Sequence, residues 1–197
     1  MEYSWSVVTP PVAPNNRPVT VELARMQCRV PDESQDELLA QLIDAATQYV
    51  QTSGRLILCP QTIKVQWPAL PCEDAYLTLP FGPVRGTVTL EYKSADTETW
   101  TAITDFQSWT DALPSRLAPA PGASWPATQA LAVPAARATY AAGYASAAAI
   151  PANLKNAVLM LVRINYESPD GWMKTGSVKI PDLVEQMIGP SSRRGYP

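Results

Sequence analysis

The hydrophobic pattern of the chain changes its period twice, and this feature constrains the fold more than any other. In residues 38–50 the apolar side chains recur at helical spacing, and the same spacing returns in residues 154–162. Between these segments the pattern alternates, as in Ile63, Val65 and Trp67, which is typical of a strand. The sequence therefore predicts an α+β protein in which a β-rich insertion interrupts a small core of about four helices.

The same changes of period predict the domain boundaries. We expect an extended N-terminal arm in residues 1–19, because four prolines stand between positions 10 and 18 and proline stiffens an extended backbone. The other expected parts are a helical core in residues 20–56 and 151–189, a β-rich insertion in residues 57–150 and a C-terminal tail in residues 190–197.

Caps and spacing predict the first two helices. Thr20 is the expected N-cap of the first, which places Leu23, Met26 and Val30 on one face. The second begins in an acidic stretch that suits the positive end of the helix dipole, and it ends at Gly54. Its acidic residues are Asp32, Glu33, Asp36 and Glu37, and its apolar stripe is Leu38, Leu39, Leu42, Ile43, Ala46, Tyr49 and Val50.

Two more helices are predicted near the C-terminus. Residues 151–167 carry an apolar stripe that is wider than one face, so this helix is buried on more than one side, either in the core or between subunits. A short helix is expected in residues 181–189, with Leu183, Met187 and Ile188 together on one face.

Alternation predicts several short strands in the insertion. One contains Ile63, Val65 and Trp67, and Val88, Leu90 and Tyr92 repeat the pattern. Further strands are expected in residues 76–79, 99–103, 106–109 and 137–144.

The composition excludes several function classes. The chain has no histidine, which excludes Ser-His-Asp and Cys-His catalysis and histidine-containing zinc sites. A net charge of −3 without a basic cluster argues against a protein that grips nucleic acid. No phosphate-binding glycine loop, signal peptide or membrane-length apolar run is present. We therefore expect no catalytic residue, cofactor, metal or membrane contact, and we expect Cys28, Cys59 and Cys72 to be reduced thiols in a cytosolic setting.

Some polar groups allow two interpretations. The acidic stretch can hold a divalent ion or be a solvated helix start, and the helix dipole favours the second. Ser177 and Lys179 can form a nucleophile pair, but two such residues share a strand face by alternation alone. Arg193 and Arg194 can touch DNA or an acidic partner, or be a solvated chain end.

The six tryptophans can be stacking platforms for carbohydrate or single strands, or they can be packing residues. Packing is favoured for Trp67 and Trp100, which occupy strand positions. An interface role and local packing are equally open for Trp125 and Trp172, which stand in loops. The remaining two are Trp5 and Trp109.

Three segments together resemble the phage head-tail connector family, also called adaptor or head-completion proteins, whose longer members carry a β-rich insertion. The segments are PVTVELARMQCRVPDESQDELLAQLIDAATQYVQTSGR, RLAPAPGASWP and ATYAAGYASAAAIPANLKNAVLMLVRINYESPDG. None of them is a catalytic motif, so the resemblance rests on their order and joint presence.

The resemblance implies a structural virion protein and not an enzyme. Such a connector is assembled in the bacterial cytoplasm and forms a ring, commonly of twelve subunits, in the neck of a tailed phage or phage-like particle. Its partners are the portal protein, a stopper or tail terminator protein, and double-stranded DNA that passes without specific binding.

The resemblance also implies two sets of contact residues. The C-terminal segment of the family reaches into the portal, and by position this tail is Ser191, Ser192, Arg193, Arg194, Gly195, Tyr196 and Pro197. The doubly apolar helix is the expected ring interface, through Leu154, Val158, Leu161, Val162 and Tyr166.

Two other functions remain open at this point. One is a different neck or tail-completion protein, such as a stopper or terminator. The other is a small carbohydrate-active enzyme of the virion, which requires two carboxylates that face one cleft.

Overall fold

A computed structural model describes residues 3–12, 16–71, 75–94, 99–111, 114–128, 134–167 and 182–192. The chain divides into two compact units. The helical unit contains Val12–Cys59 and Tyr144–Arg194, and the β unit contains Met1–Pro11 and Pro60–Gly143.

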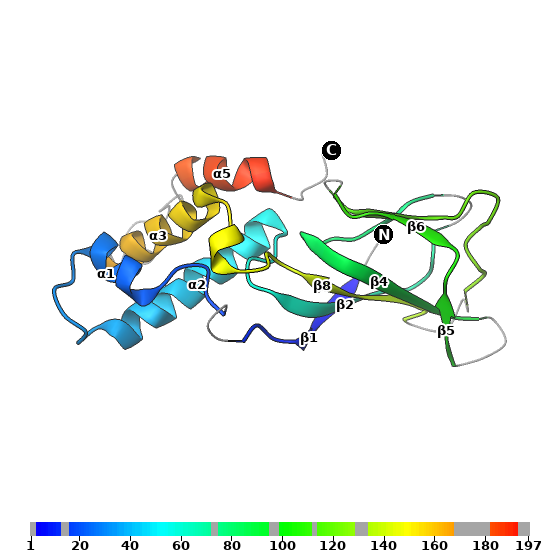
Figure 1. The fold of residues 1–197 in the computed structure, drawn as a ribbon, viewed down its shortest axis with the longest axis horizontal. Coiled ribbons are helices and arrows are strands. Elements are labelled where there is room, and N and C mark those ends of the chain that lie inside the picture. The colour runs from blue at the N-terminus through cyan, green and yellow to red at the C-terminus, as the bar shows by residue number, and fades with distance from the viewer. Residues whose placement is uncertain are drawn as a thin grey trace, which may run out of the picture. The chain divides into compact units, whose positions relative to one another are not determined.

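Four α-helices form the described part of the helical unit, and the predicted α+β class is confirmed. The helix α3 contacts α1, α2 and α5, so it lies at the centre of the unit (Figure 1). The bounds are α1 Val21–Cys28, α2 Asp36–Gly54, α3 Ala152–Glu167 and α5 Asp182–Ile188, with short 3₁₀ turns η1 Ala147–Ala149 and η2 Gly189–Ser191. None of the described helices is both long and apolar enough to cross a membrane.

The helical core joins residues from both ends of the chain. Leu39, Ile43 and Val50 of α2 are fully buried in the same cluster as residues of α3 and α5. The stripe predicted for the second helix is therefore confirmed, except that Leu38 lies on the exposed side. The members of the cluster from the C-terminal half are Ile150, Leu154, Ala157, Val158, Leu161, Val162, Val184 and Ile188.

The predicted N-cap of α1 is confirmed, but its predicted buried face is wrong. The Thr20 hydroxyl accepts a hydrogen bond from the Leu23 amide at 3.3 Å. The buried residues are Ala24 and Cys28, whereas Leu23 and Met26 are exposed. Of the predicted face only Val30, which follows the helix, packs partly buried against the core. Small side chains at the contact let α1 approach α3 closely, and hydrophobicity alone favoured the larger residues.

The predicted face of the last helix is also partly wrong. Val184 and Ile188, four residues apart, enter the core, and Leu183 is exposed. Gly54 ends α2 as predicted, although the left-handed residue after the helix is Arg55, with φ 51°. A Cβ at Gly54 would lie 2.8 Å from Leu56 Cδ1 and 2.9 Å from Ile188 Cγ2, so glycine here permits α5 to approach α2.

The β unit contains two antiparallel sheets. One has five strands in the order β1-β2-β8-β4-β5, and the other has three in the order β3-β7-β6. Every strand predicted in the insertion is present; β7 was not predicted, and β1 lies in the arm that was predicted to be extended. The bounds are β1 Ser4–Thr9, β2 Gln61–Trp67, β3 Leu77–Thr78, β4 Val84–Lys93, β5 Trp100–Ile103, β6 Phe106–Trp109, β7 Arg116–Pro119 and β8 Ala136–Ala142.

Each sheet buries one face. Ile63, Val65 and Trp67 are buried as their alternation predicts, and Leu77 and Leu117 are the buried pair of the second sheet. In β4 only Leu90 of the three predicted residues is buried, since Val88 and Tyr92 remain half-exposed.

The other face of the five-stranded sheet carries a charged cluster. Arg137 of β8 donates two hydrogen bonds, of 2.7 and 3.0 Å, to the carboxylate of its cross-strand neighbour Glu91. The guanidinium also lies 4.1 Å from the centre of the Trp100 ring, and Lys93 lies 5.3 Å from it. Hydrogen bonds from Arg137 lower the pKa of Glu91. This cluster ties β8, β4 and β5 together.

We expect Glu91→Gln to lower the free energy of unfolding of the β unit by about 1 kcal/mol at pH 7, because it removes a bidentate charged pair. Since the pKa of Glu91 is lower in the folded protein, the contribution is present above the unfolded pKa and is lost as the pH falls through the folded one. The difference from wild type should therefore shrink below about pH 4.

Denaturant unfolding followed by tryptophan fluorescence at pH 7 and pH 3 measures this difference. The control is Glu167→Gln, whose carboxylate pairs with Arg163 on an exposed helix face and should cost less than about 0.5 kcal/mol. An equal effect of Glu91→Gln at both pH values would contradict the assignment.

Candidate assembly surfaces

The residues predicted as ring contacts lie mainly inside the subunit. Leu154, Val158 and Val162 are 0% exposed and Leu161 is 4% exposed, while Tyr166 is partly buried against the same core. The apolar stripe of α3 is wide because three other helices pack against α3. Of the two interpretations of this stripe, the core is the one observed for these four residues, so they are not available on the surface of the subunit.

Two residues of the predicted tail are bound to the helical unit. The Asn153 side-chain amide donates to the Met187 carbonyl at 2.6 Å and lies 3.4 Å from the Ser191 hydroxyl. The Ser192 hydroxyl donates to the Gly54 carbonyl at 3.4 Å. The root of the tail is therefore fixed between α2 and α3. The rest of the predicted tail, Arg193, Arg194, Gly195, Tyr196 and Pro197, lies outside the described residues.

The acidic helix start, which we define as Asp32, Glu33, Asp36 and Glu37, is partly neutralised by Arg25. The guanidinium lies 3.1 Å from Asp36 and 3.7 Å from Glu33. Hydrogen bonds from Ser34 lower the pKa of Asp32. Glu37 has no ion-pair partner among the described residues. In the same part of the chain, no group of three or more His, Cys, Asp or Glu side chains is placed to hold a metal ion.

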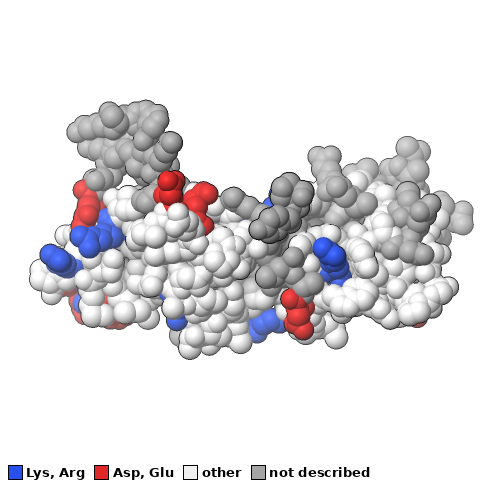
Figure 2. Space-filling view, turned by 90° about the horizontal axis from the view of Figure 1, so that it is seen from above, with Lys and Arg blue, Asp and Glu red and all other residues white. Residues whose placement is uncertain are grey.

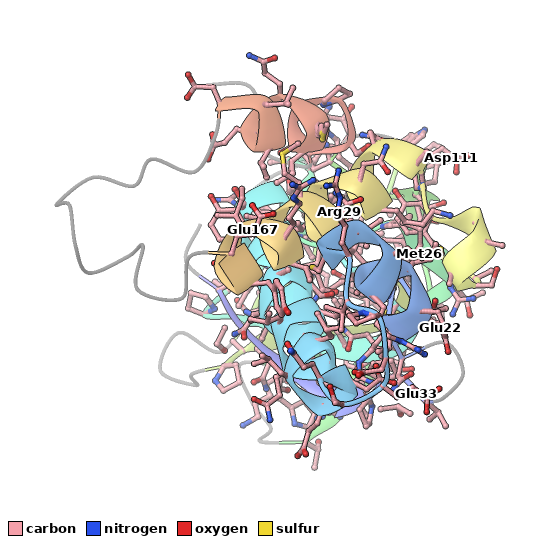
Figure 3. The ribbon with its side chains drawn as sticks, turned by 90° about the vertical axis from the view of Figure 1, so that its left-hand side faces the viewer. Glu22, Met26, Arg29, Glu33, Asp111 and Glu167 are labelled. Carbon is pink, nitrogen blue, oxygen red and sulfur yellow. The ribbon has the colours of Figure 1, made fainter. Side chains whose placement is uncertain are left out.

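Several apolar side chains remain on the surface. Figure 3 shows Glu22, Met26 and Arg29 along the outer side of α1, and Met26 is 68% exposed. The edge strand β1 is exposed along its whole length, and its Trp5 packs on Phe81 with ring centres 4.7 Å apart. On the face shown in Figure 2 the charged side chains are scattered among uncharged ones and form no broad basic patch.

The tryptophans divide into core and surface residues. Trp67 is buried as predicted, and Trp125 is buried with its indole N–H donating to the Ala75 carbonyl at 2.8 Å. Trp100, for which packing was favoured, is half-buried in β5 and packs under two cations outside the core. Trp172, Ser177 and Lys179 lie outside the described residues.

Three residues on or directly beside the three-stranded sheet form a surface cluster, which we call the aromatic platform: Tyr76, which precedes β3, with Trp109 and Arg116. The two rings meet edge to face with centres 5.8 Å apart, and the guanidinium lies 5.6 Å from the centre of the Tyr76 ring. Tyr76 is 56% and Trp109 is 45% exposed. Strand pairing fixes the geometry, since Arg116 of β7 is directly opposite both Trp109 of β6 and Thr78 of β3.

Sequence reasoning missed the aromatic platform. Its members are separated by many residues, and Arg116 stands in β7, whose sequence RLAP gives no alternation signal and ends in a proline. The strand at 106–109 was predicted, but no signal in it shows that Trp109 faces solvent.

Part of the chain matches a known protein family. Residues 18–74 match the model of the phage gp6-like head-tail connector proteins. The predicted resemblance to head-tail connectors is thereby confirmed. The matched segment contains α1, α2 and β2, and the family model does not extend over the rest of the chain.

Solved structures share the fold over nearly the whole chain. A chain from the neck of an empty gene transfer agent (GTA) particle, computed with C6 symmetry, matches with a TM-score of 0.73 and 22% identity, over 95% of this chain and 94% of that chain. A chain from the neck of the native particle, computed with C12 symmetry, matches with a TM-score of 0.70 and 23% identity, over 95% and 93%. Among the curated proteins, none matches the chain.

The close approach at Gly54 predicts that Gly54→Val displaces α5. The new side chain would overlap Leu56 and Ile188. This overlap should lower the free energy of unfolding of the helical unit by about 2 kcal/mol and displace the root of the tail. Gly189→Val is the matched control, because a Cβ there meets no atom within 4 Å. Hydrogen exchange of the amides of residues 184–188 measures the effect. Equal protection in the two variants would contradict this role of Gly54.

Proposed function

We propose that the chain is a head-tail connector, a non-enzymatic subunit of a ring in the neck of a tailed phage or phage-like particle. The ring sits beneath the portal and continues the DNA channel toward the tail. The observation that carries this proposal is the coincidence of two findings in one chain: a head-tail connector match in residues 18–74 and the fold of neck chains over 95% of the length.

The extent of the structural match supports a connector in which the β-rich insertion is part of each assembled subunit. Both the helical unit and the β unit fall within the matched length of the neck chains. Those necks were computed with C6 and C12 symmetry, which supports a closed ring with six-fold or twelve-fold symmetry. A cyclic ring joins two different surfaces of each subunit, so a connector needs two distinct contact patches.

The composition supports a channel that lets DNA pass. The net charge is −3 and only 17% of residues are charged. A channel wall made of copies of this chain would therefore neither bind phosphate groups strongly nor produce a strong electrostatic field. We assign the portal contact to the tail and the opposite side of the ring to a stopper or tail terminator protein.

The fixed root of the tail shows where a deletion that tests the portal contact should begin. Because Ser191 and Ser192 are bound to α3 and α2, the deletion should begin at Arg193. We expect removal of residues 193–197 to reduce attachment to the portal at least about tenfold, because these residues are the assigned portal contact. Thermal unfolding should remain unchanged.

Co-sedimentation of the purified chain with portal measures this attachment. Unchanged attachment of the deletion variant would remove the tail assignment while leaving the connector itself in place. Failure of the wild-type chain to join portal or the particle neck under any condition would contradict the connector proposal.

A further inference from the structure

The aromatic platform has the composition of the centre of a protein interface. Tryptophan, tyrosine and arginine are the residues that dominate binding energy at such centres. Here Trp109 and Arg116 are held by the paired strands β6 and β7, Tyr76 directly precedes β3, and both rings are about half exposed. Because the strands fix the side chains before any contact is made, little ordering entropy would be lost on binding.

The polar groups of the platform define the chemistry of its partner. The Arg116 guanidinium has no hydrogen bond or ion pair with any described residue, and it lies over the Tyr76 ring, 5.6 Å from the ring centre. Arginine only donates hydrogen bonds, as does the indole N–H of Trp109. A matching surface therefore supplies acceptors, most effectively carboxylates, next to an apolar side chain that covers the rings.

The first turn of α2 provides this combination in the same chain. Glu37 is exposed and has no ion-pair partner within the described ranges, and the adjacent Leu38 is 46% exposed. Asp32 and Glu33 add negative charge nearby, of which Arg25 offsets only a part. The platform belongs to the β unit and the acidic helix start to the helical unit, so they are two different surfaces of one subunit.

We propose that the aromatic platform of one copy receives the acidic helix start of the next copy, with Glu37 at Arg116 and Leu38 on the rings of Tyr76 and Trp109. This contact rests on the proposed ring and gives it the two unlike patches that a head-to-tail interface requires. The contact replaces the α3 residues first assigned to the ring, which lie in the core.

Charge reversal tests the pairing. Arg116→Glu and Glu37→Lys should each lower the ring population at least about tenfold, because each places like charges together, and the double variant should restore it. The control is Arg116→Glu combined with Asp182→Lys, which reverses a carboxylate beside the exposed Leu183 on α5 and should not restore rings. Native mass spectrometry with and without portal measures the ring population, and thermal unfolding confirms that each variant is folded.

A cysteine pair tests the same contact without changing its charges. Thr78 is exposed directly beside Arg116, and Gln41 is exposed one turn after Glu37. Oxidation of Thr78→Cys with Gln41→Cys should give a ladder of linked copies in assembled rings, whereas Thr78→Cys with Gln186→Cys on α5 should not.

The outcomes separate this contact from the ring proposal itself. If wild type forms no ring with or without portal, the ring proposal fails. If wild type forms rings and Arg116→Glu forms them equally well, the platform is not the contact. If Asp182→Lys restores rings in place of Glu37→Lys, or the α5 cysteine pair links instead, the assignment to the acidic helix start is wrong.

Discussion

The meeting of α2 and α3 in one core is the contact on which the rest of the structure depends. These helices come from opposite ends of the chain, and Leu39, Ile43 and Val50 of α2 are buried in the same cluster as Leu154 and Val158 of α3. A backbone hydrogen bond of 3.2 Å from the Tyr144 amide to the Leu58 carbonyl joins the two points where the chain leaves and re-enters the helical unit. The long insertion is thus a closed loop with its own core. Since the entropy of loop closure grows slowly with length, such an insertion adds little cost to the helical unit.

Elements with a strong single period were predictable from the sequence. The helices at 36–54 and 152–167 and the strand at 61–67 follow their patterns closely, because each buries a continuous apolar stripe. For shorter elements the position along the chain was predicted correctly, but the buried face was not. In α1 the buried positions are Ala24 and Cys28, since close helix packing selects small residues that a hydrophobic pattern does not mark.

The α3 residues that we predicted as ring contacts lie in the core of the subunit, for a related reason. A stripe wider than one face shows that a helix is covered on several sides, but it does not show whether its own chain or a neighbour covers it. The described helices α1, α2 and α5 cover α3, so the stripe reports the core. The aromatic platform could not be predicted from the sequence, because only the pairing of β7 with β3 and β6 brings Tyr76, Trp109 and Arg116 together.

In the proposed connector, stability and assembly use different residues. The apolar stripes that dominate the sequence hold each unit together, and the surfaces that we propose for partners are small and mixed: the aromatic platform, the acidic helix start, and the fixed root of the tail. The low fraction of charged residues suits the proposed connector, which is built into a larger particle. Prolines at the joints of the chain suit the same role, because they limit the conformations that assembly must select.

The central claim is that this chain forms the connector ring of a particle neck. Electron cryomicroscopy of particles that contain the chain tests it most directly, with the neck reconstructed without imposed symmetry. The connector account predicts a closed ring of this fold directly beneath the portal, with the helical unit and the β unit both resolved in every subunit. A neck whose ring beneath the portal has a different fold, or this fold found only at another level of the particle, would contradict it.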